Sequence, residues 1–459
     1  MLRRQYFLYI FSFVVVILLS CKLMPKEEEK KATAATAAKL IDGHPDWIMQ
    51  GNIYEVNVRQ YTPEGTFKSF EKHLDRLKEM GVQTLWFMPI NPIGKVDRKG
   101  VMGSYYAVSD YTTINPEFGT LDDWKAFVEH AHKMGFKVII DWVPNHTSAD
   151  HVWLTTHPRF FKDSLGKAAI PFDWTDTRQL DYTNTEMQDS MIASMKYWVT
   201  NTAIDGFRCD VAWNVPGTFW SRCISELKKI NPSLFMLAEG DKPYLHPSGF
   251  DATYPWEMFH MMVKVAKGER PAFALDSIKN RFDTLYPANG LLLYFTSNHD
   301  ENSWNKADYG TMPGPIHAPF AVFTQTMYHS IPLIYSGQEE PVLDSISFFY
   351  KDTIIFNHLS RAKFYKALLD LRKNNPALAA NASFRKVHAG DDKAVYAYVR
   401  EAGDKKVFVI LNLSPGEQTI KVTDTSLHGE PYNLFMYTKE PLKDTEWKIE
   451  PWGYVVYVY

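Results

Sequence analysis

The sequence has only three cysteines among 459 residues, at positions 21, 209 and 223, too few for a disulfide framework in a chain of this size. We expect Cys209 and Cys223 to be buried thiols.

Neither sign of charge is in large excess: the chain has 50 Lys and Arg and 53 Asp and Glu, and its net charge is −3. Without a strong positive field the protein is not suited to bind nucleic acid, so we expect no nucleic-acid partner. Hydrophobic residues make up 45% and charged residues 22%, which excludes wholesale disorder, collagen and a polytopic membrane protein.

The amino-terminal segment has the pattern of an export signal. Arg3 and Arg4 precede an apolar run over 6–19, which is shorter than the roughly 20 residues that span a bilayer. The run leads into Leu-Leu-Ser-Cys at Cys21, an ending that resembles a bacterial lipobox. This resemblance implies a signal peptide at 1–20 and a lipid on Cys21. An uncleaved signal anchor is the alternative.

A polar, low-complexity stretch follows, with an acidic run close to Cys21 and then many Ala and Thr residues. We interpret 21–43 as a lipid-anchored tether, because it is too polar to build a core. The acidic run resembles the surface-export signal of some outer-membrane lipoproteins. We therefore expect an exported protein, lipid-anchored to the outer membrane at the cell surface or on the periplasmic face. This anchor would be its single contact with the membrane.

From residue 52 onward, eight short β-rich runs alternate with amphipathic helical stretches, which is typical of a parallel α/β fold. The runs are 53–58, 84–88, 138–140, 206–209, 234–238, 251–254, 291–295 and 332–335. The spacing of apolar residues predicts one helix over 67–80 and another over 120–134, each followed by a glycine. The alternation predicts a (β/α)8 TIM barrel.

Acidic residues fall at the carboxyl ends of four predicted strands: Asp141, Asp210, Glu239 and Asp300. One strand-plus-helix unit of such a barrel takes about 31 residues. Asp210 and Glu239 are 29 residues apart, which is one unit, and Glu239 and Asp300 are 61 apart, which is two. Asp141 and Asp210 are 69 apart, which leaves room for an insertion of roughly 40 residues after strand 3. Because active sites of these barrels lie at this end, the four acids are candidates for one site.

After residue 372 the helical pattern gives way to alternating runs typical of antiparallel strands. These runs are 384–387, 394–400, 406–413 and 454–458. We therefore divide the chain beyond the tether into a catalytic barrel at 44–146 and 191–377, a short inserted domain B at 147–190, and a C-terminal antiparallel β-sandwich domain at 378–459.

Arg208 and Asp210 lie two positions apart on one predicted strand, so their side chains share a face. A guanidinium lowers the pKa of a neighbouring carboxyl, and we therefore expect Asp210 to be ionised and usable as a nucleophile. Glu239 is on the next strand and shares the opening with other acids, so we expect it to keep a proton and to act as general acid and later as base. Histidine-containing motifs at 145–146 and 298–300 add hydrogen-bonding groups. Cleavage of a glycosidic bond requires such paired carboxylates.

Four segments resemble, in the same order, the four signature regions of the α-amylase family, glycoside hydrolase family 13. They are DWVPNH at 141–146, GFRCD at 206–210, AE at 238–239 and SNHD at 297–300. GSYY at 103–106 also resembles the tyrosine segment on which the family stacks its substrate. The resemblance extends over about residues 45–459.

The resemblance implies a retaining glycoside hydrolase that cleaves α-1,4-glucosidic bonds of starch-type glucans or maltooligosaccharides, as an α-amylase does. Asp210 would be the nucleophile, Glu239 the acid and base, and Asp300 the group that stabilises the transition state. Five residues would bind the substrate or support those that do: Tyr106, Asp141, His146, Arg208 and His299. The chemistry needs no cofactor, and we expect a monomer whose partner is the glucan.

The resemblance also bears on calcium. Family members that hold this ion use an Asn that matches Asn145, an Asp in the insertion and a backbone carbonyl after the nucleophile. Here Gln179 stands in place of that Asp, and Asn214 in place of a usual His. We therefore expect no metal ligands. A structural calcium ion stays the alternative, because backbone carbonyl oxygens also bind calcium.

Other activities stay open at this point. A neopullulanase- or cyclomaltodextrinase-like hydrolase, an α-glucosidase acting on oligosaccharides, or a transglycosylase would use the same acids. The absence of an acidic loop at 61–65, and of a long segment before the barrel, favours the α-amylase. A non-catalytic glucan-binding lipoprotein is the alternative outside the enzymes, but such proteins lose one of the three acids that this chain keeps. Trp213 is either a platform for the leaving sugar or part of the core.

Overall fold

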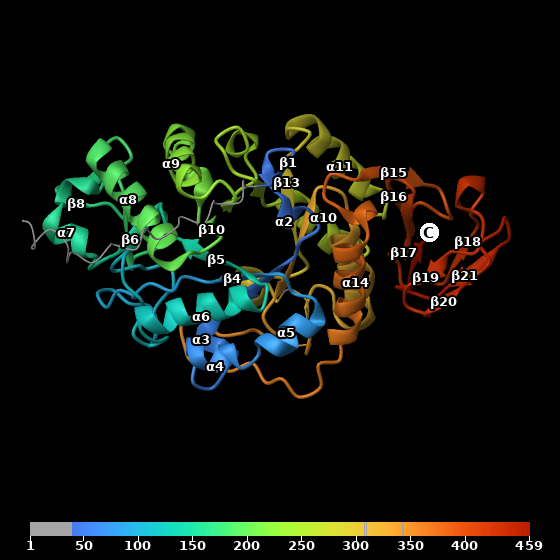
Figure 1. The fold of residues 1–459 in the computed structure, drawn as a ribbon, viewed down its shortest axis with the longest axis horizontal. Helices are drawn as coiled ribbons and strands as arrows, with labels where there is room; N and C mark the ends of the chain where they lie inside the picture. The colour runs from blue at the N-terminus through green and yellow to red at the C-terminus, as the bar shows by residue number, and fades with distance from the viewer. Residues whose placement is uncertain (1–38, 307, 309, 342–343) are drawn as a thin grey trace, which may run out of the picture. The chain divides into compact units, whose positions relative to one another are not determined.

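Eight parallel strands close into a barrel, in the order in which they occur in the sequence (Figure 1). They are β3 (Ile53–Val56), β4 (Thr84–Phe87), β5 (Lys137–Trp142), β10 (Gly206–Cys209), β11 (Phe235–Ala238), β12 (Ala252–Thr253), β13 (Leu291–Tyr294) and β14 (Ser330–Tyr335). The barrel closes because its last strand, β14, pairs in parallel with its first strand, β3. The predicted barrel is confirmed, and every predicted strand is present.

The structure is a computed structural model that describes residues 39–306, 308, 310–341 and 344–459. The predicted signal peptide, Cys21 and the greater part of the predicted tether lie outside the described residues. The described chain begins with a hairpin of β1 (Leu40–Ile41) and β2 (His44–Pro45), so regular structure starts inside the range interpreted as tether. The hairpin is held because the His44 ring lies 2.9 Å from the Asp251 carboxylate and 2.7 Å from the carbonyl oxygen of Asn289.

Helices follow most of the strands and pack their apolar sides on the barrel. They are α2 (Asp46–Met49), α3 (Val58–Tyr61), α4 (Phe67–Glu71), α5 (Leu74–Met80), α6 (Leu121–Lys133), α8 (Thr185–Thr202), α9 (Gly217–Ile230), α10 (Trp256–Ala266), α11 (Ala274–Leu285), α12 (His299–Asn305), α13 (His317–Thr326) and α14 (Ala362–Asn374). The stretch 67–80, predicted as one helix, is split into α4 and α5, and the ring of His73 at the break packs edge-on against Tyr61. Helix α6 begins as predicted, because Thr120 and Asp123 form a capping box. None of the helices in the described part of the chain is long and apolar enough to cross a membrane.

The insertion between β5 and β10 is small and antiparallel. In it, β6 (His146–Ser148) pairs with β9 (Thr177–Gln179), and β7 (Asp163–Ser164) pairs with β8 (Lys167–Ala168). One short helix, α7 (Val152–Thr156), lies between these strands. The insertion leads into α8, whose first turn is capped by the Asn184 side chain.

The C-terminal part is an antiparallel β domain, as predicted. Its six-stranded sheet has the order β15 (Ser383–Val387), β16 (Val395–Ala402), β17 (Lys405–Asn412), β22 (Tyr454–Val458), β19 (Tyr432–Asn433) and β20 (Thr438–Lys439). A second sheet pairs β18 (Gln418–Ile420) with β21 (Trp447–Ile449). The four strands absent from the sequence prediction have two or three residues each, too few to show a period. Tyr396 and Tyr398 of β16 belong to the same apolar core as the barrel helices α10 and α13.

A buried arginine holds the amino-terminal end of the seam between β14 and β3. Arg372, in α14, is fully buried and donates to four carbonyl oxygens. Its acceptors lie before β3, at the start of β14 and at the entry to the C-terminal domain: Met49 at 3.3 Å, Gly51 at 2.8 Å, Ser330 at 2.5 Å and Leu378 at 2.9 Å. One side chain therefore joins segments that are more than 300 positions apart.

Arg372→Met should lower the free energy of unfolding by about 3 kcal/mol or more, because several buried carbonyl groups lose their donor together. Lys373→Met is the matched control, an exposed cation at the next position of the same helix, and should change stability by less than about 0.5 kcal/mol. Urea unfolding followed by tryptophan fluorescence measures both variants. Equal stability of the two would contradict the role of Arg372 at the seam.

Candidate active site

The predicted acids converge on one cavity of about 370 Å³ at the carboxyl ends of the strands. Asp210, Glu239 and Asp300 line it together with Tyr106 and His146. Asp141, Arg208 and His299 lie directly behind this lining and touch its residues. The structure thus brings all eight predicted catalytic and substrate-binding residues to one place. A larger hollow of about 680 Å³, beside Tyr328 and Phe384, contains none of them.

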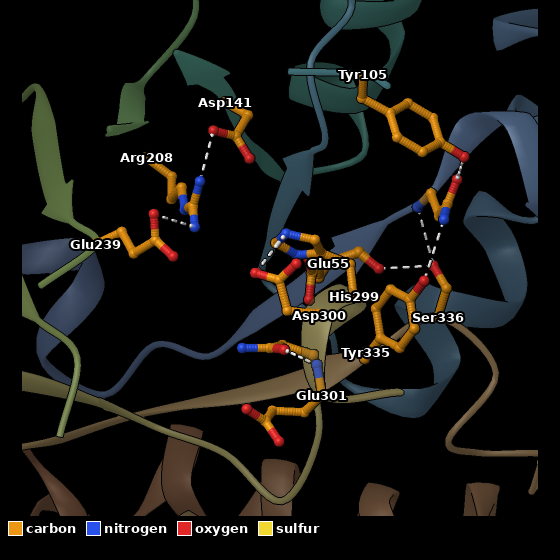
Figure 2. Close-up of polar contacts among 12 residues, drawn as sticks. Glu55, Tyr105, Asp141, Arg208, Glu239, His299, Asp300, Glu301, Tyr335 and Ser336 are labelled. Atoms are coloured by element: carbon orange, nitrogen blue, oxygen red, sulfur yellow. Dashed lines mark hydrogen bonds and ion pairs between the residues drawn. The ribbon is translucent and has the colours of Figure 1, made fainter. Parts of the chain in front are cut away.

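Arg208 is the centre of the charge arrangement. Its guanidinium is fully buried, with Nη1 3.1 Å from Asp141 Oδ1 and 3.0 Å from Asp210 Oδ1. Nη2 lies 3.1 Å from Glu239 Oε2 (Figure 2). The register explains this grouping, because Arg208 of β10 pairs directly with Asp141 of β5, while Glu239 follows the neighbouring strand β11. One cation is therefore shared among three carboxyl groups.

Asp210 does not have the lowered pKa expected from the neighbouring Arg208. Burial raises the pKa of Asp210 well above its usual range, the Glu239 carboxylate adds to the rise, and the opposing effect of Arg208 is the smaller one. Burial likewise raises the pKa of Asp141 to about 6. The sequence shows the Arg208–Asp210 spacing but shows neither the burial nor the second and third carboxylates on the same guanidinium.

Glu239 is oriented by two contacts to one oxygen. Besides the ion pair with Arg208, its Oε2 accepts a hydrogen bond of 2.7 Å from the backbone N–H of Val211. Val211 has a φ of 44°, a left-handed conformation that is rare for a β-branched residue. The turn after Asp210 is therefore held in a costly conformation that directs its N–H at Glu239.

His299 lies between two carboxylates (Figure 2). Its Nδ1 is 2.5 Å from Glu55 Oε1, and its Nε2 is 3.2 Å from Asp300 Oδ2. Burial opposes a charge here, but the Asp300 and Glu55 carboxylates raise the pKa of His299 well above its ordinary value. Burial also opposes a charge on Asp300, yet the pKa of Asp300 is lowered, chiefly by His299. His299 is thus an imidazolium that keeps Asp300 ionised.

Glu55 is the residue that reasoning from sequence missed. It lies on β3, is fully buried, and is 244 positions away from the histidine that it contacts. One signal was available: a glutamate stands between Tyr54 and Val56 in the first predicted strand, and buried carboxylates are rare unless they are paired.

Tyr106 and His146 form the walls of the cavity. The Tyr106 ring stacks on His299 with centroids 5.4 Å apart, and its hydroxyl lies 3.0 Å from Asp141 Oδ2 and 2.8 Å from His299 Nε2. Burial lowers the pKa of His146 to about 3, so this ring is neutral and offers a hydrogen bond rather than a charge. The Trp174 ring packs edge-on against His146 at 5.1 Å. An apolar ring face next to fixed polar groups suits a sugar, which has apolar faces and hydroxyl edges.

The residues at the position considered for calcium do not fit that ion. Asn145 Oδ1, which would be a ligand, accepts a hydrogen bond of 2.9 Å from Asn214 Nδ2, and Asn145 Nδ2 is 3.1 Å from His146 Nδ1. An amide–amide hydrogen bond therefore joins the insertion to the turn after Asp210. Across the described ranges of the chain, no group of three or more His, Cys, Asp or Glu side chains is placed to hold a metal.

Cys209 and Cys223 are buried free thiols, as expected. Cys209 follows Arg208 on β10 and points away from the acids, into the apolar core under the helices. Burial raises its pKa well above the ordinary value, so it is an inert thiol rather than a nucleophile.

Two family models match the chain. The model described as "Alpha amylase, catalytic domain" matches residues 38–168 and 170–354, and the model described as "Alpha-amylase SusG C-terminal domain" matches residues 395–456. The first match covers the barrel up to the loop after β14 together with the insertion. The second covers the greater part of the C-terminal domain.

Relatives and solved structures agree with these models. Alpha-amylase MalA of Haloarcula japonica is 27% identical over 414 residues, which cover 84% of this chain and 59% of that protein. Neopullulanase 2 of Thermoactinomyces vulgaris is 27% identical over 394 residues, or 78% of this chain and 64% of that protein. The chain therefore spans only about three fifths of the length of these two relatives. A crystal structure of an alpha-amylase from Lactobacillus plantarum matches 90% of this chain and 99% of its own, with a TM-score of 0.81 and 29% identity.

Glu55→Gln should lower the pKa of His299. The substitution keeps the shape of the side chain but removes the negative charge that stabilises the imidazolium. An opposite charge at this distance shifts a pKa by about one to three units, so we expect a decrease of at least one unit. NMR of protein labelled with ¹⁵N-histidine reads the ring directly, with His299→Asn to assign its signal.

Glu301→Gln is the control for that measurement. Glu301 lies two positions beyond His299 and is buried, but its carboxylate accepts from Asn305 at 3.1 Å instead of contacting the imidazole. An unchanged pKa of His299 in Glu55→Gln, or an equal change of this pKa in both variants, would show that Glu55 does not stabilise the charged ring.

Proposed function

The chain belongs to the alpha-amylase family, and we propose that it is a retaining glycoside hydrolase that cleaves α-1,4-glucosidic bonds of starch-type glucans or maltooligosaccharides. One observation carries the proposal: the Arg208 guanidinium holds the carboxyl groups of Asp210 and Glu239 side by side at the mouth of the barrel. Asp300 lines the same cavity. Two carboxyl groups and a third acid around a sugar-sized opening are what this reaction needs.

In the first step, the Asp210 carboxylate attacks the anomeric carbon of the bound sugar, and the bond from that carbon to the glycosidic oxygen breaks. Glu239 donates its proton to this oxygen, so the leaving sugar departs with a hydroxyl group. The product on the protein is an ester between the sugar and Asp210. The reactive form of the pair therefore has Asp210 ionised and one proton on Glu239.

In the second step, the Glu239 carboxylate takes a proton from a water molecule, whose oxygen attacks the anomeric carbon. The ester bond breaks and Asp210 becomes a carboxylate again. Each step inverts the anomeric carbon, so the overall configuration is retained. Asp300, kept ionised by His299, stabilises the positive charge that develops on the sugar ring in both steps.

The remaining residues position the sugar. Tyr106 offers a ring face at the cavity wall, and His146 presents a ring nitrogen to hydroxyl groups. His299 lies behind this wall, where Glu55, Asp300 and the Tyr106 hydroxyl occupy both of its ring nitrogens, and it holds Asp300 and Tyr106 in place. Arg208 and Asp141 hold the acids and the Tyr106 hydroxyl in place from behind. Because every residue of this set belongs to a single chain, we also propose that the enzyme acts as a monomer.

Similarity to a neopullulanase supports a second candidate, an enzyme directed at cyclodextrins, pullulan or short oligosaccharides. The two candidates use the same acids and differ in the shape of the cleft. A product time course on starch, pullulan, cyclodextrin and maltotriose separates them. Early fragments of intermediate length from starch favour the α-amylase, whereas preference for cyclodextrin or pullulan favours the alternative, and glucose as the sole product favours an α-glucosidase.

Asp210→Asn and Glu239→Gln should each lower the turnover number at least about 100-fold, because each removes a group that takes part in both chemical steps. Asp241→Asn is the control: this carboxylate is two positions past Glu239 but is 38% exposed, and its loss should leave turnover near the wild-type value. Initial rates on soluble starch and maltoheptaose measure all three. NMR of the anomeric protons shows whether the first product is the α-anomer. Wild-type rates in either acid variant would rule out the assignment.

We further propose that export and lipidation of Cys21 attach the enzyme to the outer membrane, at the cell surface or on the periplasmic face. The support is the lipobox-like ending at Cys21 and the polar stretch that follows it.

Cys21→Ser should abolish incorporation of labelled palmitate and move the protein from the membrane to the soluble fraction, because the thiol that receives the lipid is lost. Lys22→Ser, at the neighbouring position, should retain the label. Expression in a Gram-negative host followed by membrane fractionation measures both. Palmitate on the Cys21→Ser protein would exclude this site of lipidation.

A further inference from the structure

The guanidinium of Arg208 is enclosed by three aromatic rings. Its central carbon lies over the rings of Trp86, Tyr254 and Tyr106, at 5.2, 5.6 and 5.8 Å from their centroids. Trp86 and Tyr254 are fully buried, and Tyr106 is nearly so. The faces of aromatic rings attract a cation, and more strongly where water is excluded. The three rings therefore stabilise the charge of a side chain that is fully removed from water.

Tyr254 also binds the guanidinium through a hydrogen bond. Arg208 Nε donates to the Tyr254 hydroxyl oxygen at 3.2 Å. Burial raises the pKa of Tyr254 well above its ordinary value, so the phenol stays neutral and its oxygen is an acceptor for Nε. The acids of the site contact the terminal nitrogens of Arg208, whereas Tyr254 contacts the nitrogen at the base of the fork.

The bond to Nε fixes the direction in which the fork points. A guanidinium is planar and rigid, so the position of Nε determines where both terminal nitrogens lie. Nη1 contacts Asp141 and Asp210, whereas Nη2 contacts Glu239 (Figure 2). Two carboxyl groups therefore attract one side of the fork and one carboxyl group attracts the other. An acceptor on Nε keeps this uneven attraction from turning the fork toward Asp141, which takes no part in the chemical steps.

Tyr254 is itself placed by the segment that carries the acid. It follows β12, and its backbone N–H donates at 3.0 Å to the carbonyl oxygen of Gly240, the residue after Glu239. Its ring packs against Trp256 at 5.2 Å and against Phe295 at 5.7 Å. These contacts connect the position of the Tyr254 hydroxyl to the backbone that bears Glu239.

We propose that Tyr254 is a positioning residue, whose hydroxyl holds the Arg208 guanidinium in the orientation in which one fork serves both Asp210 and Glu239. Tyr254 is fully buried behind the residues that line the cavity, so it acts through Arg208 and not on the sugar. This rests on the proposed function and deepens it, because it makes the alignment of the nucleophile with the acid depend on a residue after a third strand, β12. A side chain of this kind should affect turnover and leave substrate binding unchanged.

Tyr254→Phe removes the hydroxyl group and keeps the ring. It should lower kcat on maltoheptaose about tenfold and change KM by less than about twofold, because a small misplacement of the reacting groups slows turnover while the cavity lining stays intact. Tyr294→Phe is the matched control, a buried tyrosine at the end of the next strand, β13, whose ring packs against Phe323 at 6.1 Å. Both kinetic constants of the control should stay near the wild-type values.

A second measurement follows the guanidinium without turnover. In protein labelled with ¹⁵N-arginine, Arg208→Lys assigns the Nε–H signal of Arg208. In Tyr254→Phe this signal should shift, and its proton should exchange with water about fivefold faster, because the donor has lost its acceptor. The signal should stay in place in Tyr294→Phe.

A wild-type kcat in Tyr254→Phe, a loss confined to KM, or an equal loss of kcat in Tyr294→Phe would overturn the proposal. An Arg208 signal that is the same in Tyr254→Phe and in the wild type would overturn it too. If the wild type cleaves no α-glucan, the proposed hydrolase function fails, and the Arg208 signal then decides by itself whether Tyr254 holds the guanidinium.

Discussion

The site depends on a single buried cation shared among three carboxyl groups. Arg208 contacts Asp141, Asp210 and Glu239 at 3.0–3.1 Å, and burial raises the pKa values of Asp141 and Asp210 in spite of this cation. The guanidinium therefore sets how the three carboxyl groups lie, while burial governs the pKa values of Asp141 and Asp210. Replacing the guanidinium by a point charge would lose the fork that bridges Asp210 and Glu239.

The third acid is controlled separately, by a different cation. Asp300 lies opposite His299, and Glu55 contacts His299 from behind, so Asp300 and the carboxyl groups around Arg208 have different cations as their nearest neighbours. Tyr106 joins the two arrangements, because its hydroxyl contacts both Asp141 and His299. A change in protonation at one side can therefore be transmitted to the other through a single hydroxyl group.

The fold was predictable from the sequence because its signals are local. Each strand run and the Thr120 cap lie within one strand-and-helix unit, and the acids recur at intervals of such units, so these signals predict the barrel without knowledge of the contacts. The grouping of the candidate residues was predictable too, since parallel strands bring their carboxyl ends to one edge. The raised pKa of Asp210 was not, because it depends on burial and on contact with Glu239, which follows the adjoining strand β11. Glu55 was missed because its partner is 244 positions away.

The small insertion contributes to the cavity from outside the barrel. It carries His146 and Trp174 into the cavity, and the Asn145–Asn214 hydrogen bond joins it to the turn after β10. The same turn donates the N–H of Val211 to Glu239. The orientation of Glu239 and the position of the insertion therefore depend on one turn, so a substitution that loosens this turn would disturb the cavity wall and the Glu239 carboxyl group together.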